Sequence, residues 1–259
     1  DFKNSYEYHD KNRFVEVGAE ISFEHYMFGN NDPHKVNKDH TGILMYCNDF
    51  NGDYSYTNVV TTDWKVIEGF TPAEFANGIN DANFQNAGTV DISHLFEEGR
   101  PLYLAWYYKI NSGTRRTGYR LRNFKLDAVV EDNPSLSSTL YILPQLGLQW
   151  VLNPAAANHT DGTDRPYVND TEMRWIWPTS YNVPAEYVAY AVSGPIELPQ
   201  YDLGKDWPTL FTTEWNNDRM DYSYTYTQAG EYEVVFIASG VNNKERQEIV
   251  KKITIQVEE

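Results

Sequence analysis

The amino-acid sequence predicts an all-β protein built from two consecutive β-sandwiches. The first observation is the segment 42–70, in which an apolar strand is followed by an Asn/Gly/Asp turn and then by an aromatic stretch containing Trp64. The second is the run PLYLAWYYKI at 101–110. The third is the period-two alternation of YEVVFIASG and IVKKITIQV near the end of the chain. Such short apolar or alternating runs, separated by turn residues, are typical of strands.

The first 130 residues predict a series of strands in order. Residues 16–26 alternate in part, and 43–47 form an unbroken apolar run, which favours a strand buried on both faces. Asn51-Gly52 predicts a tight turn, followed by an alternating strand at 54–59. A short helical turn is expected at 71–75, a strand at 89–95, and a hairpin at 115–130.

The strand at 101–110 allows a finer prediction. Trp106 and Tyr108 share one parity and Tyr107 has the other, so Tyr107 points away from the other two. We expect Trp106 and Tyr108 to belong to the core.

Residues 131–192 have a different texture, rich in Pro, Asn, Asp and Trp. We expect an irregular elaboration of the first domain here, with a partly helical stretch near Leu146 and a long polar loop at 153–171. Gly194-Pro195 predicts a boundary. The expected domains are therefore a sandwich at 1–194 and an immunoglobulin-like module at 195–259, with further strands at 210–215 and 222–226.

Composition excludes several classes of partner. The net charge of −16 disfavours binding to nucleic-acid phosphates and to anionic membrane surfaces. No apolar stretch approaches the length of about 18 residues that a membrane-spanning helix needs, so no transmembrane span is expected. Cys47 is the single cysteine, so an internal disulfide is impossible, and its apolar surroundings predict a buried, inert thiol.

Several motifs together resemble a known family. DFNGDY after an apolar strand, Trp64, GTVDIS around Asp91, and YRLRNFKL resemble Bacteroidetes-type surface lipoproteins that carry a domain of unknown function. These look like relatives of the cleaved-adhesin and choice-of-anchor jelly rolls. The resemblance covers roughly 40–130 and implies a galactose-binding-like jelly-roll sandwich. The tail YSYTYTQAGEYEVVF resembles the polycystic-kidney-disease (PKD) type of Ig-like module, over about 193–259.

The resemblance also implies a cellular setting. It suggests a protein of the outer-membrane surface, lipid-anchored through an N-terminal Cys that lies before Asp1. Implied partners are polysaccharides or oligosaccharides and SusC/SusD-like outer-membrane import proteins. The family itself has no assigned activity.

Two interpretations are open for Asp49, Asn51 and Asp53. Oxygen ligands at alternate positions around a Gly suit a structural calcium ion, which is the one candidate cofactor. Asn-Gly-Asp is also the ordinary chemistry of a turn, which is the interpretation we favour, because the Glu that ends a full calcium loop is missing.

Catalytic motifs are weak. Glycoside hydrolysis needs two nearby carboxylates, and the candidates are Glu68, Glu74, Asp91, Glu172 and Glu186. With 37 acidic residues in the chain, chance pairs are expected and no motif selects one of them. The six histidines (His9, His25, His34, His40, His94 and His159) are scattered, with no H-x-x-x-H pair, so no zinc site is predicted.

Sugar binding is the functional hypothesis that the residues favour. Trp175 and Trp177 alternate in RWIWP, so they share a face if that stretch is extended, and Arg174 and Trp150 are further candidates. Together with the setting that the resemblance implies, this leads us to expect a non-catalytic, cell-surface glycan-binding or adhesion-like domain that takes part in polysaccharide utilisation. The alternatives are a structural or interaction component of an outer-membrane import complex, and a glycan-acting hydrolase.

Overall fold

The protein is all-β, and its chain divides into two compact units, Asp1–Lys205 and Asp206–Glu259. The computed structural model describes residues 14–29, 41–77, 80–111, 117–131, 133–154, 166–175, 186–202, 223–241 and 246–258. The first unit holds most of the strands and both hydrophobic cores.

The strands and helices of the first unit have the following bounds. Its strands are β1 (Phe14–Val15), β2 (Gly18–Gly29), β3 (Thr41–Cys47), β4 (Lys65–Val66), β5 (Phe75–Asn77), β6 (Gln85–Asp91), β7 (Tyr103–Ile110), β8 (Thr117–Val129), β9 (Ser138–Ile142), β10 (Gln149–Leu152), β11 (Tyr167–Val168), β12 (Glu172–Trp175), β13 (Tyr187–Val192) and β14 (Tyr201–Asp202). Its helices are α1 (Tyr56–Thr61) and the 3-10 turns Asp81–Asn83, Ser93–Leu95, Pro134–Leu136 and Leu143–Leu146.

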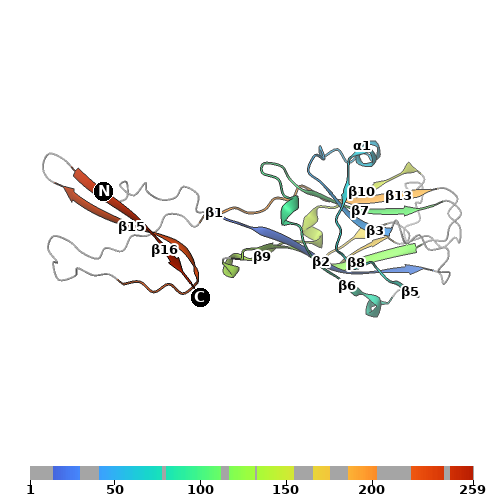
Figure 1. Cartoon of the computed structure of the whole chain (residues 1–259). Helices are drawn as coiled ribbons and strands as arrows, with labels where there is room; N and C mark the ends of the chain where they lie inside the picture. Colours follow the sequence, from blue (N-terminus) through green and yellow to red (C-terminus); the bar gives the residue numbers. More distant parts are fainter. Residues whose placement is uncertain are drawn as a thin grey trace. The chain divides into compact units, whose positions relative to one another are not determined.

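These strands form a sandwich of two sheets. One sheet has the order β10-β13-β7-β3-β4. The other has the order β11-β12-β8-β2-β5, with β6 also paired to β2 and β9 to β8. Figure 1 shows the two sheets as separate layers, with α1 on the outer side of the five-stranded one. All pairings are antiparallel except that of β2 with β5. β1 and β14 form a separate short pair.

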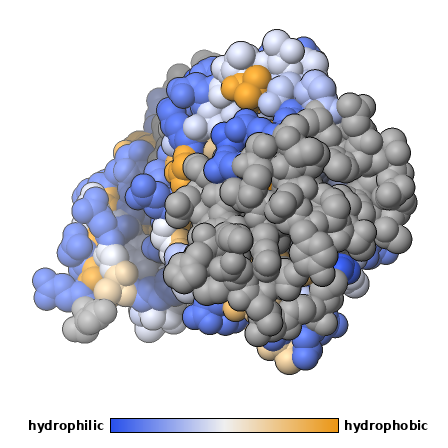
Figure 2. All heavy atoms as spheres, turned by 90° about the vertical axis from the view of Figure 1, so that its right-hand side faces the viewer, coloured by the Kyte–Doolittle hydropathy of each residue, from blue (hydrophilic) through white to orange (hydrophobic). Residues whose placement is uncertain are grey.

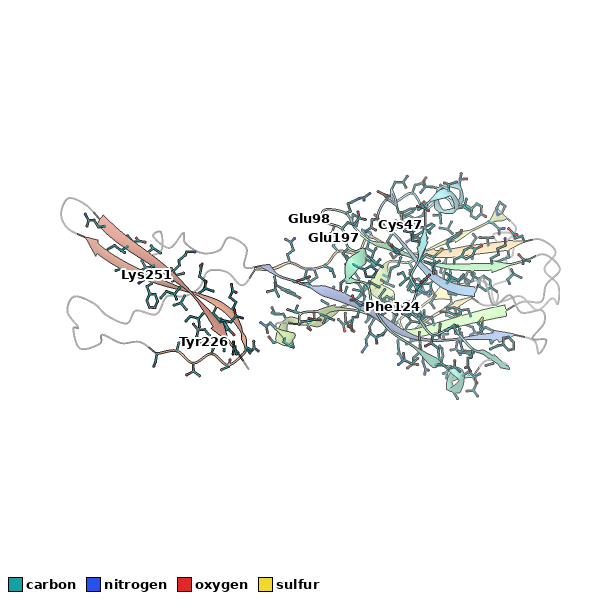
Figure 3. All side chains as sticks on the ribbon, viewed as in Figure 1. Cys47, Glu98, Phe124, Glu197, Tyr226 and Lys251 are labelled. Carbon is teal, nitrogen blue, oxygen red and sulfur yellow. The ribbon has the colours of Figure 1, made fainter. Side chains whose placement is uncertain are left out.

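The main core lies between the sheets, and β7 shows how the sequence builds it. Leu104, Trp106 and Tyr108 are fully buried in this core. Tyr107, of opposite parity, packs in a second, smaller core on the outer side of the five-stranded sheet. The predicted division of Trp106 and Tyr108 from Tyr107 is thus confirmed. Figure 3 marks Phe124 on β8, whose ring packs edge-on against Trp106.

The segment after Asn51 corrects one expectation. Instead of a hairpin with an alternating strand at 54–59, the chain forms helix α1, Tyr56–Thr61. The Ser55 hydroxyl accepts the backbone N–H of Asn58 at the helix start, which satisfies one of the donors that a helix N-terminus leaves open. Val59 is fully buried in the outer core, and the indole of Trp64 donates to its carbonyl at 2.9 Å. The burial of one side of α1 therefore favours a helix here, although the local alternation predicted a strand.

Residues 117–129 form one long strand, β8, and not the expected hairpin. The apparent change of parity along this stretch comes from a bulge. Asn123 has φ +53°, and the pairing of β8 with β2 shifts register between Ser22 and Glu24. A bulge inserts one residue and so moves the inward parity from Leu121 to Phe124. Residues 71–75 likewise form no helical turn and lead into β5.

The segment 131–192, expected to be an irregular elaboration, supplies strands to both sheets. β13 lies between β10 and β7, and all six of its residues are buried. β12 pairs with β8 along its full length. The partly helical stretch near Leu146 is confirmed as the 3-10 turn Leu143–Leu146. Long-range pairing therefore forms strands in the described parts of this segment, despite its Pro- and Asn-rich composition.

The described part of the second unit is one antiparallel hairpin. β15 (Gly230–Val241) pairs with β16 (Arg246–Val257) from Gly230↔Val257 to Val241↔Arg246. Both strands were predicted from their alternation. The described residues before β15, 223–229, include no strand, although 222–226 was expected to form one. The strand expected at 210–215 lies outside the described residues.

Candidate functional site

The candidate site is a hollow of about 930 Å³ at one edge of the sandwich. It lies where β2 and β5 of one sheet face β3 and β4 of the other. The described wall is mainly apolar, with the side chains of Phe23, Met27, Leu44, Phe70 and Phe75. Its volume lies within the range of ligand pockets, which is about 300–1,000 Å³.

The segment 67–74 crosses from β4 to β5 and forms one side of the hollow. Three backbone hydrogen bonds fix this crossover. Ile67 donates to the carbonyl of Leu44 on β3 at 3.0 Å, and Thr71 donates to the carbonyl of Ala87 on β6 at 2.8 Å. The carbonyl of Glu74 accepts from Met27 on β2 at 2.9 Å. The wall is therefore tied to both sheets at separate points along its length.

A buried histidine adds a fourth link between the sheet and the crossover. His25 is 5% exposed, and its Nε2 lies 2.9 Å from the carbonyl oxygen of Thr71. A carbonyl only accepts, so Nε2 carries the proton, and Nδ1 accepts from the hydroxyl of Tyr119 at 3.0 Å. Burial lowers the pKa of His25 to about 4, which keeps the ring neutral near pH 7.

The aromatic rings at the hollow are packed on one another. The Phe23 and Phe70 centroids are 4.8 Å apart, and Phe23 meets His25 edge-on at 5.1 Å. Phe23 is buried, whereas Phe70 and Phe75 are half-buried. The latter two thus combine a fixed position with accessible ring surface.

Two of the five candidate acids reach this hollow. Glu68 and Glu74 both line it and are both exposed, and the Oε2 of Glu74 accepts from Gln85 at 2.8 Å. Their nearness to the same hollow could not be derived from their spacing alone.

The other three candidate acids are paired elsewhere. Asp91 accepts from the backbone N–H and the hydroxyl of Ser93, and the hydroxyl bond is the first cause of its lowered pKa. Glu172 pairs with Arg120, and Glu186 pairs with Lys109. All three carboxylates are thus engaged within the protein, and none of them lines the hollow.

Trp175 does not form the expected exposed platform, which corrects the prediction for this residue. Its side chain is 1% exposed and lies in the main core. It packs on Trp150 with centroids 5.0 Å apart and stacks with Tyr108 at 5.9 Å. Trp150 is half-buried against the same core, and Trp177 lies outside the described residues. Because β12 pairs with β8, the Trp175 side chain faces the core.

Arg174 has the opposite parity and lies on the outer side of the seven-stranded sheet. Its guanidinium carbon is 5.4 Å from the Phe28 ring centroid, and its Nη1 is 3.5 Å from the Tyr167 hydroxyl. Its buried Nε has no hydrogen-bond partner within the part of the chain that the structure describes. Arg174 is thus on a different face from the hollow.

The Asp49, Asn51 and Asp53 turn uses its side-chain oxygens within the protein. Asp49 forms an ion pair with Arg100. Asn51 accepts the backbone N–H of Asp53 at 2.9 Å, and Asp53 accepts the N–H of Ser55 at 2.9 Å. Among the described residues there is no group of three or more His, Cys, Asp or Glu side chains placed to hold a metal ion. A structural calcium ion here stays a prediction, which a calcium titration of the melting temperature tests.

Cys47 on β3, marked in Figure 3, is a free, buried cysteine. Burial raises the pKa of its thiol, so it is mostly protonated near pH 7. Its inert character was predicted from its apolar neighbours.

Of the functional residues, sequence reasoning missed Phe70, Phe75 and the role of His25. The usable signal was the Gly69 to Pro72 stretch, which places a Phe between two chain-turning residues just after an apolar strand.

No helix in the described ranges is long and apolar enough to span a bilayer.

Comparison with known families identifies the chain as a member of the DUF5017 family, a domain of unknown function, whose model matches residues 1–141. The match ends before β10, β12 and β13, so the sandwich extends beyond the matched region. No curated protein and no solved structure matches the chain.

Proposed function

We propose that this DUF5017 protein is a non-catalytic, cell-surface glycan-binding domain whose sugar site is the hollow between the two sheets. The observation that carries the proposal is the joint presence of accessible Phe rings and exposed carboxylates on one wall. Sugars have apolar C–H faces and hydroxyl rims. Phe70 and Phe75 offer ring surface to the former, and Glu68 and Glu74 offer acceptors to the latter.

The rigidity of the wall supports the same proposal. The crossover 67–74 is tied by backbone hydrogen bonds to β2, β3 and β6, and by His25 to β2. A site that is already ordered loses less conformational entropy when it binds, and this favours recognition of a weak ligand such as an oligosaccharide.

The test is a glycan-array screen with plant and host polysaccharides, run in millimolar calcium and again with chelator. The key variant is Phe70→Ala, and the matched control is Phe96→Ala. Phe96 is also half-buried against the main core but does not line the hollow. We expect Phe70→Ala to lose binding while Phe96→Ala retains it. A blank array with folded wild-type protein, or equal binding by both variants, contradicts the proposal.

The hydrolase alternative shares this hollow and is distinguished by product. Glu68 and Glu74 are the two candidate acids that line it together. A binding protein leaves an array-positive polysaccharide intact, whereas a hydrolase releases new reducing ends, and Glu68→Gln or Glu74→Gln abolishes that release. We favour binding because the same wall also carries Phe70 and Phe75 for stacking.

A second candidate function, as an interaction component, is supported by the second unit. Among the described residues of this unit, the exposed large hydrophobic ones are Tyr224, Phe236, Ile249 and Ile253. In the described part of the first unit they are Val60, Val66 and Ile142, which lie on separate elements. On the face drawn in Figure 2, hydrophobic residues of the described part form small separate areas. Co-purification of outer-membrane proteins with the full chain, lost in Ile249→Ser, supports this role.

We place the domain at the outer-membrane surface, lipid-anchored, beside SusC/SusD-like import proteins and their polysaccharides. The hairpin of the second unit is compatible with a PKD/Ig-like module, and the first unit with a galactose-binding-like jelly roll. Both assignments rest on the sequence resemblance. Metabolic labelling of the full-length protein with palmitate, followed by surface proteolysis of intact cells, tests the location.

A further inference from the structure

The charge on the wall of the hollow restricts what it binds. Among the described residues that line the hollow, two are acidic, Glu68 and Glu74, and none is Lys or Arg. Lys65 on the neighbouring strand β4 has its ammonium 6.0 Å from the Tyr46 ring centroid, and it does not belong to the lining.

His25, the basic side chain among the described residues of the wall, does not offset this charge. His25 uses Nε2 to donate to Thr71 and Nδ1 to accept from Tyr119. Both nitrogens are therefore engaged within the protein, and the ring is neutral near pH 7. A ligand carboxylate or sulfate in the hollow meets two negative charges and no cation from the described wall.

We propose that the hollow selects neutral and amino sugars and rejects uronic-acid and sulfated sugars, with Glu68 and Glu74 as the residues that determine this specificity. This inference rests on the proposed function and names its ligand class. Carboxylates accept hydrogen bonds from sugar hydroxyls and pair with the ammonium of a glucosamine unit. Phe70 and Phe75 provide ring faces for the same ammonium.

The chain as a whole adds to this selection over longer distances. Its net charge is −16, so the approach of a polyanion is also disfavoured. This background repulsion is screened by salt, with a Debye length of about 8 Å at physiological ionic strength. Selection by Glu68 and Glu74 acts at contact distance and therefore persists in physiological salt.

The experiment compares immobilised neutral glucans and mannans, chitosan, and polygalacturonate, all in physiological salt. The test variant is Glu68→Gln/Glu74→Gln, which keeps shape and removes both charges. The matched control is Glu98→Gln/Glu197→Gln, which changes the net charge equally at two exposed positions outside the hollow, both marked in Figure 3.

We expect wild type to prefer neutral glycans or chitosan over polygalacturonate by about tenfold or more, because each ligand carboxylate in the hollow is repelled by two carboxylates at short range. The test variant should lose most of that preference, and the control should keep it. Equal binding of polygalacturonate by wild type, or an equal loss of preference in the control variant, overturns the charge selection and leaves the proposed function standing. A blank on every glycan overturns both.

Discussion

The Nε2 of His25 on β2 lies 2.9 Å from the carbonyl oxygen of Thr71, and this bond ties the crossover wall of the hollow to the seven-stranded sheet. The ring is buried and neutral, with Tyr119 on its other nitrogen. One histidine therefore connects the stability of the fold to the shape of the candidate site.

This bond predicts a pH-dependent stability. The pKa of His25 is about 4 in the folded protein, against its ordinary value of 6.5. Between these values the unfolded chain binds more protons than the folded one, so stability is fully present above pH 6.5 and falls as pH decreases toward 4. The expected loss is on the order of 3 kcal/mol. Urea unfolding from pH 7 to pH 4 measures it.

The matched variants for this prediction are His25→Gln and His94→Gln. His25→Gln should flatten the pH slope between 6.5 and 4, whereas His94→Gln, at an exposed position, should retain it. Equal slopes for wild type and His25→Gln would show that other groups carry the dependence.

Two glycines in the left-handed region give a second prediction. Gly42 has φ +72°, and a Cβ there would lie 2.3 Å from the Tyr119 ring. Gly52 has φ +79°, with nothing within 4 Å of its Cβ position. Gly52→Ala should cost about 1 kcal/mol for backbone strain, and Gly42→Ala should cost about 1–3 kcal/mol more through the clash. Chemical denaturation of both variants checks this, and equal costs would contradict the close approach of β3 to Tyr119.

The buried ion pair on the outer side of the seven-stranded sheet gives a third prediction. Arg120 is 8% exposed and donates from Nε to Glu172 at 2.7 Å. Glu172→Ala leaves this guanidinium buried with Asp81 as its remaining carboxylate partner, and we expect a loss of about 3 kcal/mol in stability. Glu97→Ala, which breaks the exposed pair with Arg100, should cost about 1 kcal/mol or less. Similar losses in both variants would contradict the buried character of the first pair.

The extent of the sandwich gives a fourth prediction. A chain ending at Lys205 retains β10, β12 and β13 and should unfold cooperatively. A chain ending at residue 141, where the family match stops, lacks these strands and leaves one side of β7 and the Tyr119 to Arg122 part of β8 without a partner strand. We expect it to lose near-UV circular dichroism and to aggregate. A cooperative transition in the shorter chain would show that the matched region is a complete domain.

The position of Trp175 gives a fifth prediction. Because its side chain is buried among Tyr108, Tyr119 and Trp150, Trp175→Ala should destabilise the fold by about 3–5 kcal/mol. Thermal unfolding measures the loss. A variant that keeps the wild-type melting temperature and loses only sugar binding would contradict the burial of Trp175 and support its role as an exposed sugar-binding residue.

The sequence by itself determined the fold class, the strands β2, β3, β7, β15 and β16, and the buried position of Cys47. It also placed Trp106 and Tyr108 on the face opposite Tyr107. These features depend on the alternation of side chains between the two faces of a strand, which can be read within a single strand. They were accessible without knowledge of any partner strand.

Tertiary structure decided the rest. The bulge at Asn123 keeps the two ends of β8 paired with β2. Helix α1 is stabilised because Val59 is buried in the second, smaller core. Trp175 is inside because β12 pairs with β8, and Phe70, Glu68 and Glu74 meet at one hollow because β4 and β5 belong to different sheets. Each of these outcomes depends on contacts between residues far apart in the chain, and no local pattern records them.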